Sequence, residues 1–329
     1  LQTLLGRETF RKGFDRYIAT NDGRAVTCEA FLDAMAEASG RDLSQFSLWY
    51  SQAGTPRVTV RTAWDEVNHR LTLTATQSTP ATPGQSAKRP FLIPFPVAFL
   101  SSKGEEMPVQ LAEEDEAPVA GTRMFELSAE RTQWVFGNLP EKPVLSLNRG
   151  FAAPIILDAA LTPEELAFLA ASDPDPFNRW DAMNRLLIDA VHAQTRAWLL
   201  RTPEEVSPLV ISAATKILKD PALSPAFKAV ALAMPGEKLI GEEDPLIDPH
   251  AVHAGWIAVR KAIAERNASL FLEVAAASVV EGPYEPSPEK AGLRALRNLC
   301  LGYAHAAGNP RAAIMIKDQF TNANNLTDK

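Results

Sequence analysis

The fold of this chain is decided at residues 46–60, which read FSLWYSQAGTPRVTV. Before this stretch the apolar residues recur at helical spacing, and after it they alternate with polar residues. The Gly54-Thr55-Pro56 sequence marks the change, because proline biases the residue before it toward extended geometry and cannot donate to a helix. We therefore predict that a helical segment ends here and that a β-rich segment begins.

The segment before this point, residues 1–54, is expected to form short helices. Phe10, Phe14 and Ile18 share one face of a first helix, and a second helix begins at Thr27. The Asn-Asp-Gly turn between the two helices supports that division.

The first six residues, LQTLLG, are typical of the end of an apolar helix closed by glycine. This start leads us to expect that the chain is a piece cut from a longer protein. The N-terminal helices would then lack their natural neighbour. We therefore expect an exposed apolar patch that promotes self-association, formed by Phe10, Phe14, Phe31 or Met35.

Residues 55–150 show the period of two that is typical of strands, as in the pairs Val58 and Val60 or Trp134 and Phe136. The joints between these runs are rich in proline, glycine, serine and threonine. The pattern predicts a small antiparallel β-sandwich of about seven strands. The apolar run 91–100 contains two prolines, which places it at a sheet edge or a bulge.

After Gly150 the strand pattern gives way to a repeated helix start, in which a small polar residue precedes a proline at the first helical position. Thr162 with Glu165 and Thr202 with Glu205 also form capping-box patterns. Many short capped helices in series predict an α-helical superhelical array of the armadillo or HEAT type over residues 151–329. The starts are Thr162-Pro163, Thr202-Pro203, Ser207-Pro208, Ser224-Pro225, Asp248-Pro249, Ser287-Pro288 and Asn309-Pro310.

Composition narrows the function classes. Hydrophobic residues make up 46% and charged residues 22%, which is typical of a globular protein. The net charge of -7 comes without a basic stripe, so nucleic acid is not an expected partner. No apolar run approaches the roughly 18 residues of a membrane span. Two distant cysteines favour a reducing, cytoplasmic location.

The residues that carry chemistry do not form a known motif. His250 and His253 lie one turn apart, but no further ligands are spaced to complete a metal site. Cys28 and Cys300 are interpreted as small buried thiols. The acidic run 113–116 lacks the spacing of a calcium loop and is interpreted as a solvated hairpin. We therefore assign no catalytic, cofactor-binding or metal residue within the chain.

Several separate stretches resemble one family. Residues 46–58 resemble the junction at which the catalytic domain of aminopeptidase N enzymes meets their β-domain. The other stretches resemble parts of the bacterial branch of this family. These parts are its β-domain, the exit of that domain and its helical domain. They are residues 79–85 with Pro90 and Ile93-Pro94-Phe95; NRGFAAP at 148–154; DPFNRWDA at 175–182; LRN at 296–298; and QF at 319–320 with NANNLTD at 322–328.

Enzymes of this family are zinc metallopeptidases that remove single residues from peptide N-termini. Their zinc ligands and catalytic residues precede the segment that matches Leu1, so the resemblance carries none of them to a position in this chain. It implies that residues 1–54 are the last helices of a thermolysin-like catalytic domain, 55–150 the β-domain and 151–329 an incomplete helical domain. In this family the helical domain covers the catalytic cleft, and the β-domain is the spacer.

Two hypotheses follow. The first is that this chain is the catalytically inert part of a zinc aminopeptidase, whose partners are peptides and the absent catalytic domain. The alternative is a standalone helical-repeat protein that binds a peptide or protein partner on a concave surface. A third hypothesis, a separate hydrolase site built from His250, His253 and the acidic run, has little support in the sequence.

Overall fold

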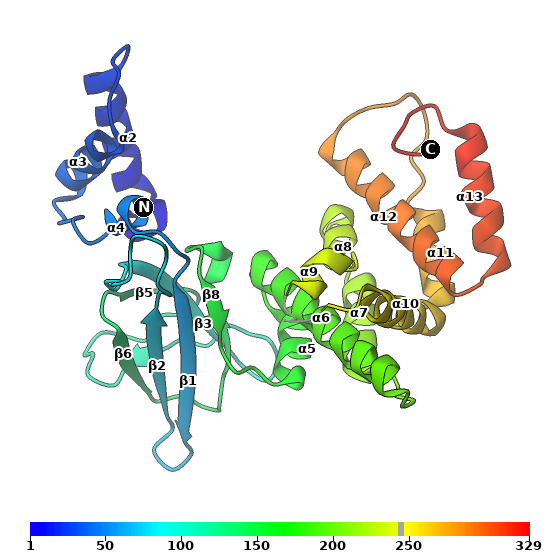
Figure 1. Ribbon diagram of the computed structural model, residues 1–329, viewed down its shortest axis with the longest axis horizontal. Helices are drawn as coiled ribbons and strands as arrows, with labels where there is room; N and C mark the ends of the chain where they lie inside the picture. Colours follow the sequence, from blue (N-terminus) through cyan, green and yellow to red (C-terminus); the bar gives the residue numbers. More distant parts are fainter. Residues whose placement is uncertain (243–246) are drawn as a thin grey trace. The chain divides into compact units, whose positions relative to one another are not determined.

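The computed structural model describes residues 1–242 and 247–329 of the chain. It forms two compact units, Leu1–Leu161 and Thr162–Lys329. The first unit contains short helices and a β-sandwich, and the second is a helical array (Figure 1). The predicted α + β multidomain class is therefore confirmed. No described helix has the length and apolarity needed to cross a membrane.

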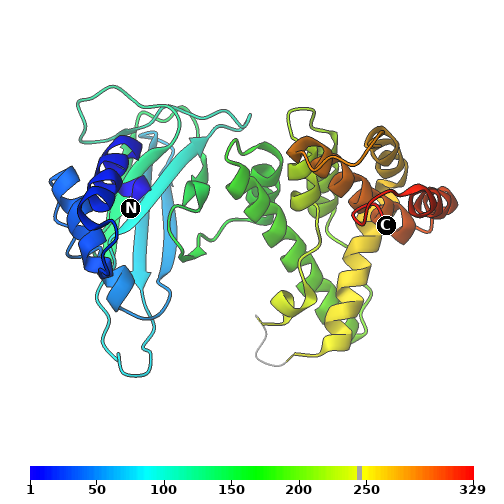
Figure 2. The same cartoon turned by 90° about the horizontal axis from the view of Figure 1, so that it is seen from above.

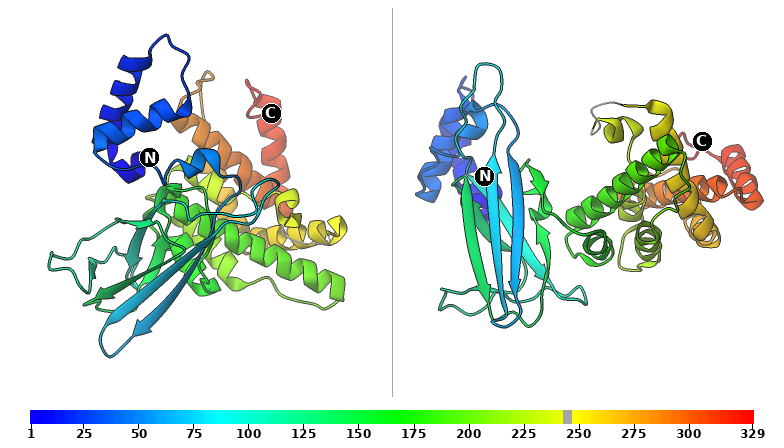
Figure 3. Two further views of the ribbon diagram at one scale, coloured as in Figure 1. Left: turned by 60° about the vertical axis from the view of Figure 1, so that its left-hand side comes forward. Right: turned by 60° about the horizontal axis from the view of Figure 1, so that its bottom comes forward.

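The N-terminal helices lie together against one side of the β-sandwich (Figure 3). Gly13 allows two of them to approach closely, because a Cβ atom at this position would lie 2.6 Å from the sulfur of Met35. Met35 is therefore fully buried, and the prediction that it contributes to an exposed patch is wrong. The four helices are α1 Gln2–Leu5, α2 Arg7–Asn21, α3 Cys28–Ser39 and α4 Leu48–Ser51.

The sandwich consists of two sheets whose inner faces share one apolar core. Alternation along the strands places Val58, Leu71 and Phe136 in this core, as the period of two predicted. The sheet orders are β4-β6-β2-β1-β8 and β5-β3-β7. The strands are β1 Arg57–Asp65, β2 Arg70–Ser78, β3 Ile93–Leu100, β4 Gln110–Leu111, β5 Arg123–Leu127, β6 Arg131–Gly137, β7 Val144–Leu147 and β8 Ile156–Asp158.

Strand β8 extends the sandwich beyond the boundary that the sequence suggests at residue 150. It pairs in parallel with the start of β1, with Arg57 opposite Ile156. All other strand pairs in the described residues are antiparallel. The short β8 carries too few residues to show an alternating pattern, so its pairing becomes visible only in the folded unit.

The position of β3 differs from the sequence expectation. Its prolines suggested a sheet edge, but β3 is the central strand of its sheet and every one of its residues is buried. The edge prediction is therefore wrong. The physical reason is that β7 pairs only with Val97–Leu100, whereas Pro94 and Pro96 lie where β5 is the sole neighbour. The missing proline N–H groups thus fall outside the shared part of the ladder.

The helical unit confirms the capped-proline starts, with one exception. Thr162 makes both bonds of the predicted capping box. No helix begins at Pro203, although the sequence predicted one, because Pro208 follows too closely and would interrupt it. The helices are α5 Pro163–Ser172, α6 Pro176–Leu200, α7 Pro208–Lys219, α8 Pro225–Ala231, α9 Glu237–Gly241, α10 Pro249–Arg266, α11 Ala268–Ala277, α12 Pro288–Ala306 and α13 Pro310–Asn322.

The long helices α6 and α10 cross at a glycine (Figure 2). A Cβ atom added to Gly255 would lie 2.6 Å from Thr195 Oγ1 and 2.8 Å from the carbonyl oxygen of Val191. Both of these atoms belong to α6, and the carbonyl oxygen of Val191 is a backbone atom that cannot move without shifting that helix. The crossing therefore depends on the absence of a side chain at this position.

We predict that Gly255→Ala lowers the free energy of unfolding by about 2 kcal/mol, because overpacking forces the two helices apart. Gly236→Ala is the matched control, since no atom lies within 4 Å of the added Cβ. The measurement is urea unfolding followed by circular dichroism. Equal stability of the two variants would contradict the proposed close contact.

Candidate functional site

The histidines do not form a metal centre in the described part of the chain. His253 lies with its Nδ1 atom 2.9 Å from Glu237 Oε1, and His250 occupies the first turn of α10, where Asp248 caps its backbone N–H. Among the described residues, no group of three or more histidine, cysteine, aspartate or glutamate side chains could hold a metal ion.

The cysteines differ from each other. Cys300 is buried within α12 as predicted, and burial raises the pKa of its thiol to about 12. Cys28 is exposed, so the prediction of a buried thiol is wrong at that position. The reason is that Cys28 is the first residue of α3, whereas the buried face of this helix is formed by residues farther along it.

The acidic run at 113–116 forms an ion pair with an arginine through one of its glutamates. Arg123 donates two hydrogen bonds to the carboxylate of Glu114, of 2.7 and 2.8 Å. These bonds, with one from the backbone N–H of Leu111, lower the pKa of Glu114 to about 2. Glu114 is therefore engaged in a structural ion pair.

The junction stretch 46–58 ties the N-terminal helices to the sandwich through side-chain amides. Trp49 donates its indole N–H to the carbonyl of Leu92 at 2.9 Å. Gln52 both donates to and accepts from the backbone of Arg89, and Gln85 does the same with the backbone of residues 51–53. We call this set of contacts the junction clamp.

The stretch 148–154 forms a tight loop that is closed by its own asparagine. Asn148 has a φ of 52°, and its amide exchanges two hydrogen bonds with the backbone of Ala153, of 3.0 and 3.1 Å. Arg149 is buried beside the loop and donates to Glu106 and Thr122. The residues of this stretch thus fix the end of the β-sandwich.

The three C-terminal stretches of the resemblance meet in one hydrogen-bond network. Arg297 donates its Nε–H to Gln319 at 2.7 Å, and Gln319 donates to Asn298 at 2.7 Å and to the carbonyl of Asp328 at 2.9 Å. Asn298 in turn donates to the carbonyl of Thr327. The network holds residues 323–329 against α12.

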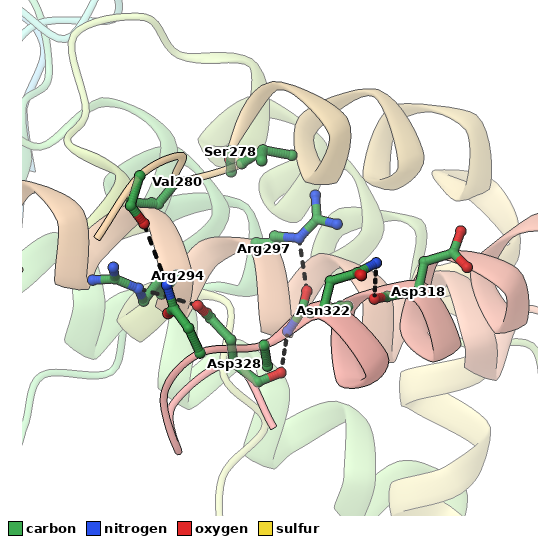
Figure 4. Close-up of a pocket in the computed structure, with 12 residues that line it drawn as sticks. Ser278, Val280, Arg294, Arg297, Asp318, Asn322 and Asp328 are labelled. Carbon is green, nitrogen blue, oxygen red and sulfur yellow. Dashed lines mark hydrogen bonds and ion pairs between the residues drawn. The ribbon is translucent and has the colours of Figure 1, made fainter. Parts of the chain in front are cut away.

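A cavity of about 350 Å³ lies beside this network, between the end of α11, α12 and α13 (Figure 4). Arg294 and Arg297 line it, together with Ser278 and Asp318. Arg294 is almost fully buried, and it donates to Asp328 and to the carbonyl of Glu285. Arg297 belongs to a motif that is visible in the sequence, whereas Arg294 and Ser278 were not predicted. The sequence signal for Arg294 is its position three residues before Arg297, which places both arginines on one face of the helix. Ser278 has no such signal.

Two family models match the chain in succession. Residues 163–329 match a domain of unknown function, DUF3458_C, that is described as ARM repeats. Residues 54–160 match a second domain of unknown function, DUF3458, that has an Ig-like fold.

The curated relatives are bacterial proteins named Aminopeptidase N. The Escherichia coli protein is 34% identical over 328 residues, and the Caulobacter vibrioides protein is 38% identical over 329 residues. The Haemophilus influenzae protein is 32% identical over 332 residues. Each match covers 100% of this chain but only 36–37% of the relative. The chain therefore spans little more than a third of the length of these proteins.

One solved structure has the same fold over nearly the whole chain. It is the crystal structure of Legionella pneumophila aminopeptidase A in complex with aspartic acid, with a TM-score of 0.82 and 21% sequence identity. The match covers 99% of this chain and 37% of that chain.

The Glu114–Arg123 pair predicts a pH-dependent contribution to stability. Because the folded pKa of Glu114 lies near 2, below its ordinary value of 4.5, this contribution is complete above about pH 4.5 and is lost as the pH falls toward 2. We expect Glu114→Gln to lower Tm at pH 7 by about 2–4 °C and to weaken the dependence of Tm on pH over this range. Glu113→Gln, at an exposed neighbour, is the control in calorimetry. An unchanged pH profile in Glu114→Gln would contradict the assignment.

The junction clamp is also expected to contribute to the free energy of unfolding. Gln85→Ala removes hydrogen bonds to the backbone of Ser51 and Ala53, so we expect a loss of about 2 kcal/mol in the free energy of unfolding. Gln133→Ala, which removes one exposed contact with Thr74, should change it by no more than about 0.5 kcal/mol. Urea unfolding compares the two variants, and similar losses would show that the clamp adds no stability.

Proposed function

This chain belongs to the bacterial aminopeptidase N family, and from that membership we propose that it is the non-catalytic part of a zinc-dependent aminopeptidase. The whole enzyme would remove N-terminal residues from peptides. The observation that carries the proposal is the match of three proteins named Aminopeptidase N to the full length of the chain.

The side chains present do not fit a zinc site. His253 is engaged with Glu237, and Glu114 is engaged with Arg123. No set of three metal-binding side chains is grouped in residues 1–242 and 247–329. We therefore derive no step of zinc chemistry from this chain and propose that zinc binds elsewhere in the whole enzyme.

The proposed role of the β-sandwich is that of a spacer. A spacer must transmit a fixed geometry from one side to the other, so its joints cannot rotate freely. The junction clamp supports this role, because Trp49, Gln52 and Gln85 leave the N-terminal helices little freedom relative to the sandwich. We propose that residues 1–54 close the catalytic domain and that residues 55–150 are the spacer.

The proposed role of residues 151–329 is that of a lid over the catalytic cleft. A lid that admits peptide ends and excludes folded proteins must be a stiff wall, and the close crossing at Gly255 supports such stiffness.

The alternative of a standalone helical-repeat interaction protein is not favoured. The matched relatives carry an aminopeptidase name and align with the sandwich as well as with the helices. The third hypothesis, a separate hydrolase site, is also not favoured, because Glu114 and His253 already have structural partners. For the whole enzyme we propose a cytoplasmic location, with peptides as substrates.

The proposal is tested by comparing this chain with the full-length protein that contains it. Each is supplied with zinc and assayed with an aminoacyl chromogenic substrate. We expect metal-dependent turnover from the full-length protein alone. Turnover by the 329-residue chain would contradict its inert role, and an inactive full-length protein whose folding is intact would contradict the aminopeptidase assignment.

We also propose that the N-terminal helices promote self-association. Phe14 and Ile18 on α2 are 43% and 46% exposed, and such adjacent apolar side chains favour contact with a second copy. We expect light scattering at high concentration to give a mass above that of one chain, and Phe14→Ser with Ile18→Ser to restore the single-chain mass. Val230→Ser, at an exposed residue of α8, is the control. A single-chain mass for the unmodified protein would overturn the proposal.

A further inference from the structure

We propose that the junction between the N-terminal helices and the β-sandwich contains a binding site for a monovalent cation, which the ammonium group of Lys88 fills in the unmodified chain. The site consists of three neutral oxygen atoms, from Ala53, Thr82 and Gln85. The existence of the site does not rest on the proposed function. Its consequence for the spacer does, because the site lies where residues 1–54 meet the sandwich.

The ammonium group of Lys88 uses all of its protons in this site. Its Nζ atom donates to the carbonyl oxygen of Ala53 at 2.8 Å, to Oγ1 of Thr82 at 2.7 Å and to Oε1 of Gln85 at 2.9 Å. An ammonium group has three donors, so none is left for another acceptor. Neutral oxygens of this kind also replace the water shell of K⁺, whose radius is similar to that of ammonium. Lys88 therefore occupies an oxygen site that suits a free monovalent cation.

Two of the three oxygens are placed by a tight turn at residues 82–85, which read Thr-Pro-Gly-Gln. The backbones of Thr82 and Gln85 exchange two hydrogen bonds, of 2.9 and 3.1 Å, and Gly84 has a φ of 77°. Proline at the second position and a positive φ at the third are typical of a type II turn. The turn holds its first and last residues side by side, so their side-chain oxygens reach the same cation.

The third oxygen is held against this turn by contacts that do not involve the ammonium group. The backbone N–H of Ala53 donates to Oε1 of Gln85 at 2.8 Å, and Nε2 of Gln85 donates to the carbonyl of Ser51 at 2.9 Å. Gly54 packs closely on the same region, since a Cβ atom added to it would lie 3.1 Å from the methyl group of Thr79. We therefore expect the three oxygens to stay together when the ammonium group is removed.

A cavity gives access to the site. Lys88 lines a cavity of about 390 Å³ whose walls contain hydroxyl groups, including that of Ser86. Arg89 and Glu130 also line it, and their charges are opposite in sign. The walls are therefore polar and, apart from Lys88 itself, carry no net charge. A small cation in this cavity would not be repelled once the ammonium group is gone.

A cation that is part of the chain makes the junction independent of the salt around it. A free ion would leave the site whenever its concentration fell, whereas a tethered ammonium group stays at a high effective concentration. The backbone at Ala53 is then held on the sandwich under all ionic conditions. We expect the unmodified chain to have the same Tm whichever monovalent cation is supplied.

The test is calorimetry of Lys88→Met, because methionine keeps an apolar stem and leaves the space of the ammonium group empty. In tetramethylammonium chloride, whose cation is too large for the site, we expect a Tm about 4 °C below that of the unmodified chain. At about 0.5 M, potassium chloride and ammonium chloride should each raise the Tm of this variant by about 2 °C or more. Lithium chloride should not, because Li⁺ holds its water shell more strongly.

Three further variants locate the effect. Lys103→Met, at an exposed lysine of the same unit, is the matched control, and its Tm should not depend on the cation. Thr82→Val, added to Lys88→Met, removes one of the three oxygens and should abolish the rise in potassium chloride. Ser86→Ala in the same background should leave that rise unchanged, because Ser86 lines the cavity without contacting the ammonium group.

A second measurement applies even if Lys88→Met does not fold. Nuclear magnetic resonance of the isotope-labelled 329-residue chain should show slow exchange with water for the ammonium protons of Lys88, because all three are hydrogen-bonded. Fast exchange at this lysine would overturn the proposal. So would an equal Tm of folded Lys88→Met in all of these salts, or an equal rise in lithium and potassium chloride. None of these results depends on whether the full-length protein is an aminopeptidase.

Discussion

The structure depends on one constraint, which is that backbone polar groups at the joints between elements must find partners away from water. Gln77 shows how this chain meets it. Its buried amide donates to the carbonyl of Phe91 and accepts from the N–H of the same residue, and it also donates to the carbonyls of Leu127 and Ala129. One side chain therefore supplies bonds that no neighbouring strand provides, at the point where β3 enters the core.

The same device explains why residues 1–54 and the sandwich form one compact unit although their sequence patterns differ so sharply. The helices do not contribute a strand to either sheet, so no ladder holds them. Side-chain amides at the junction clamp take the place of that ladder, and a small apolar cluster that includes Leu92 and Phe46 excludes water from it. A joint of this kind is directional, because each amide must both donate and accept in fixed positions.

Guanidinium groups take this role in the helical unit. Arg179 of α6 donates to the carbonyls of Ala170 and Ala171 at the end of α5, and it also pairs with Asp220 after α7. Arg297 does the same for the end of α11, where it donates to the carbonyl of Ala275, and the charge of Asp328 attracts its guanidinium.

The conformational preferences of short segments allowed much of the secondary structure of this protein to be predicted from its sequence. A polar cap followed by proline favours the start of a helix, although Thr202-Pro203 begins none, and alternating residues such as Val58 and Val60 favour a strand with one buried face. The separate motifs of the junction and of α12 were also visible, because they are short and contiguous. By itself the sequence thus determined the order of the helical and β-rich segments, the fold class and the family.

The tertiary structure decided which of these local signals prevailed and which distant residues met. Pro94 and Pro96 are tolerated in a central strand because β7 begins to pair only after them, and Ser278 lines a cavity with Arg297 because α11 ends beside α12. Such outcomes depend on strand pairing and helix packing between residues far apart in the chain. A local pattern records the preference of one segment, whereas the partners of a buried charge or hydroxyl are fixed only when the segments pack.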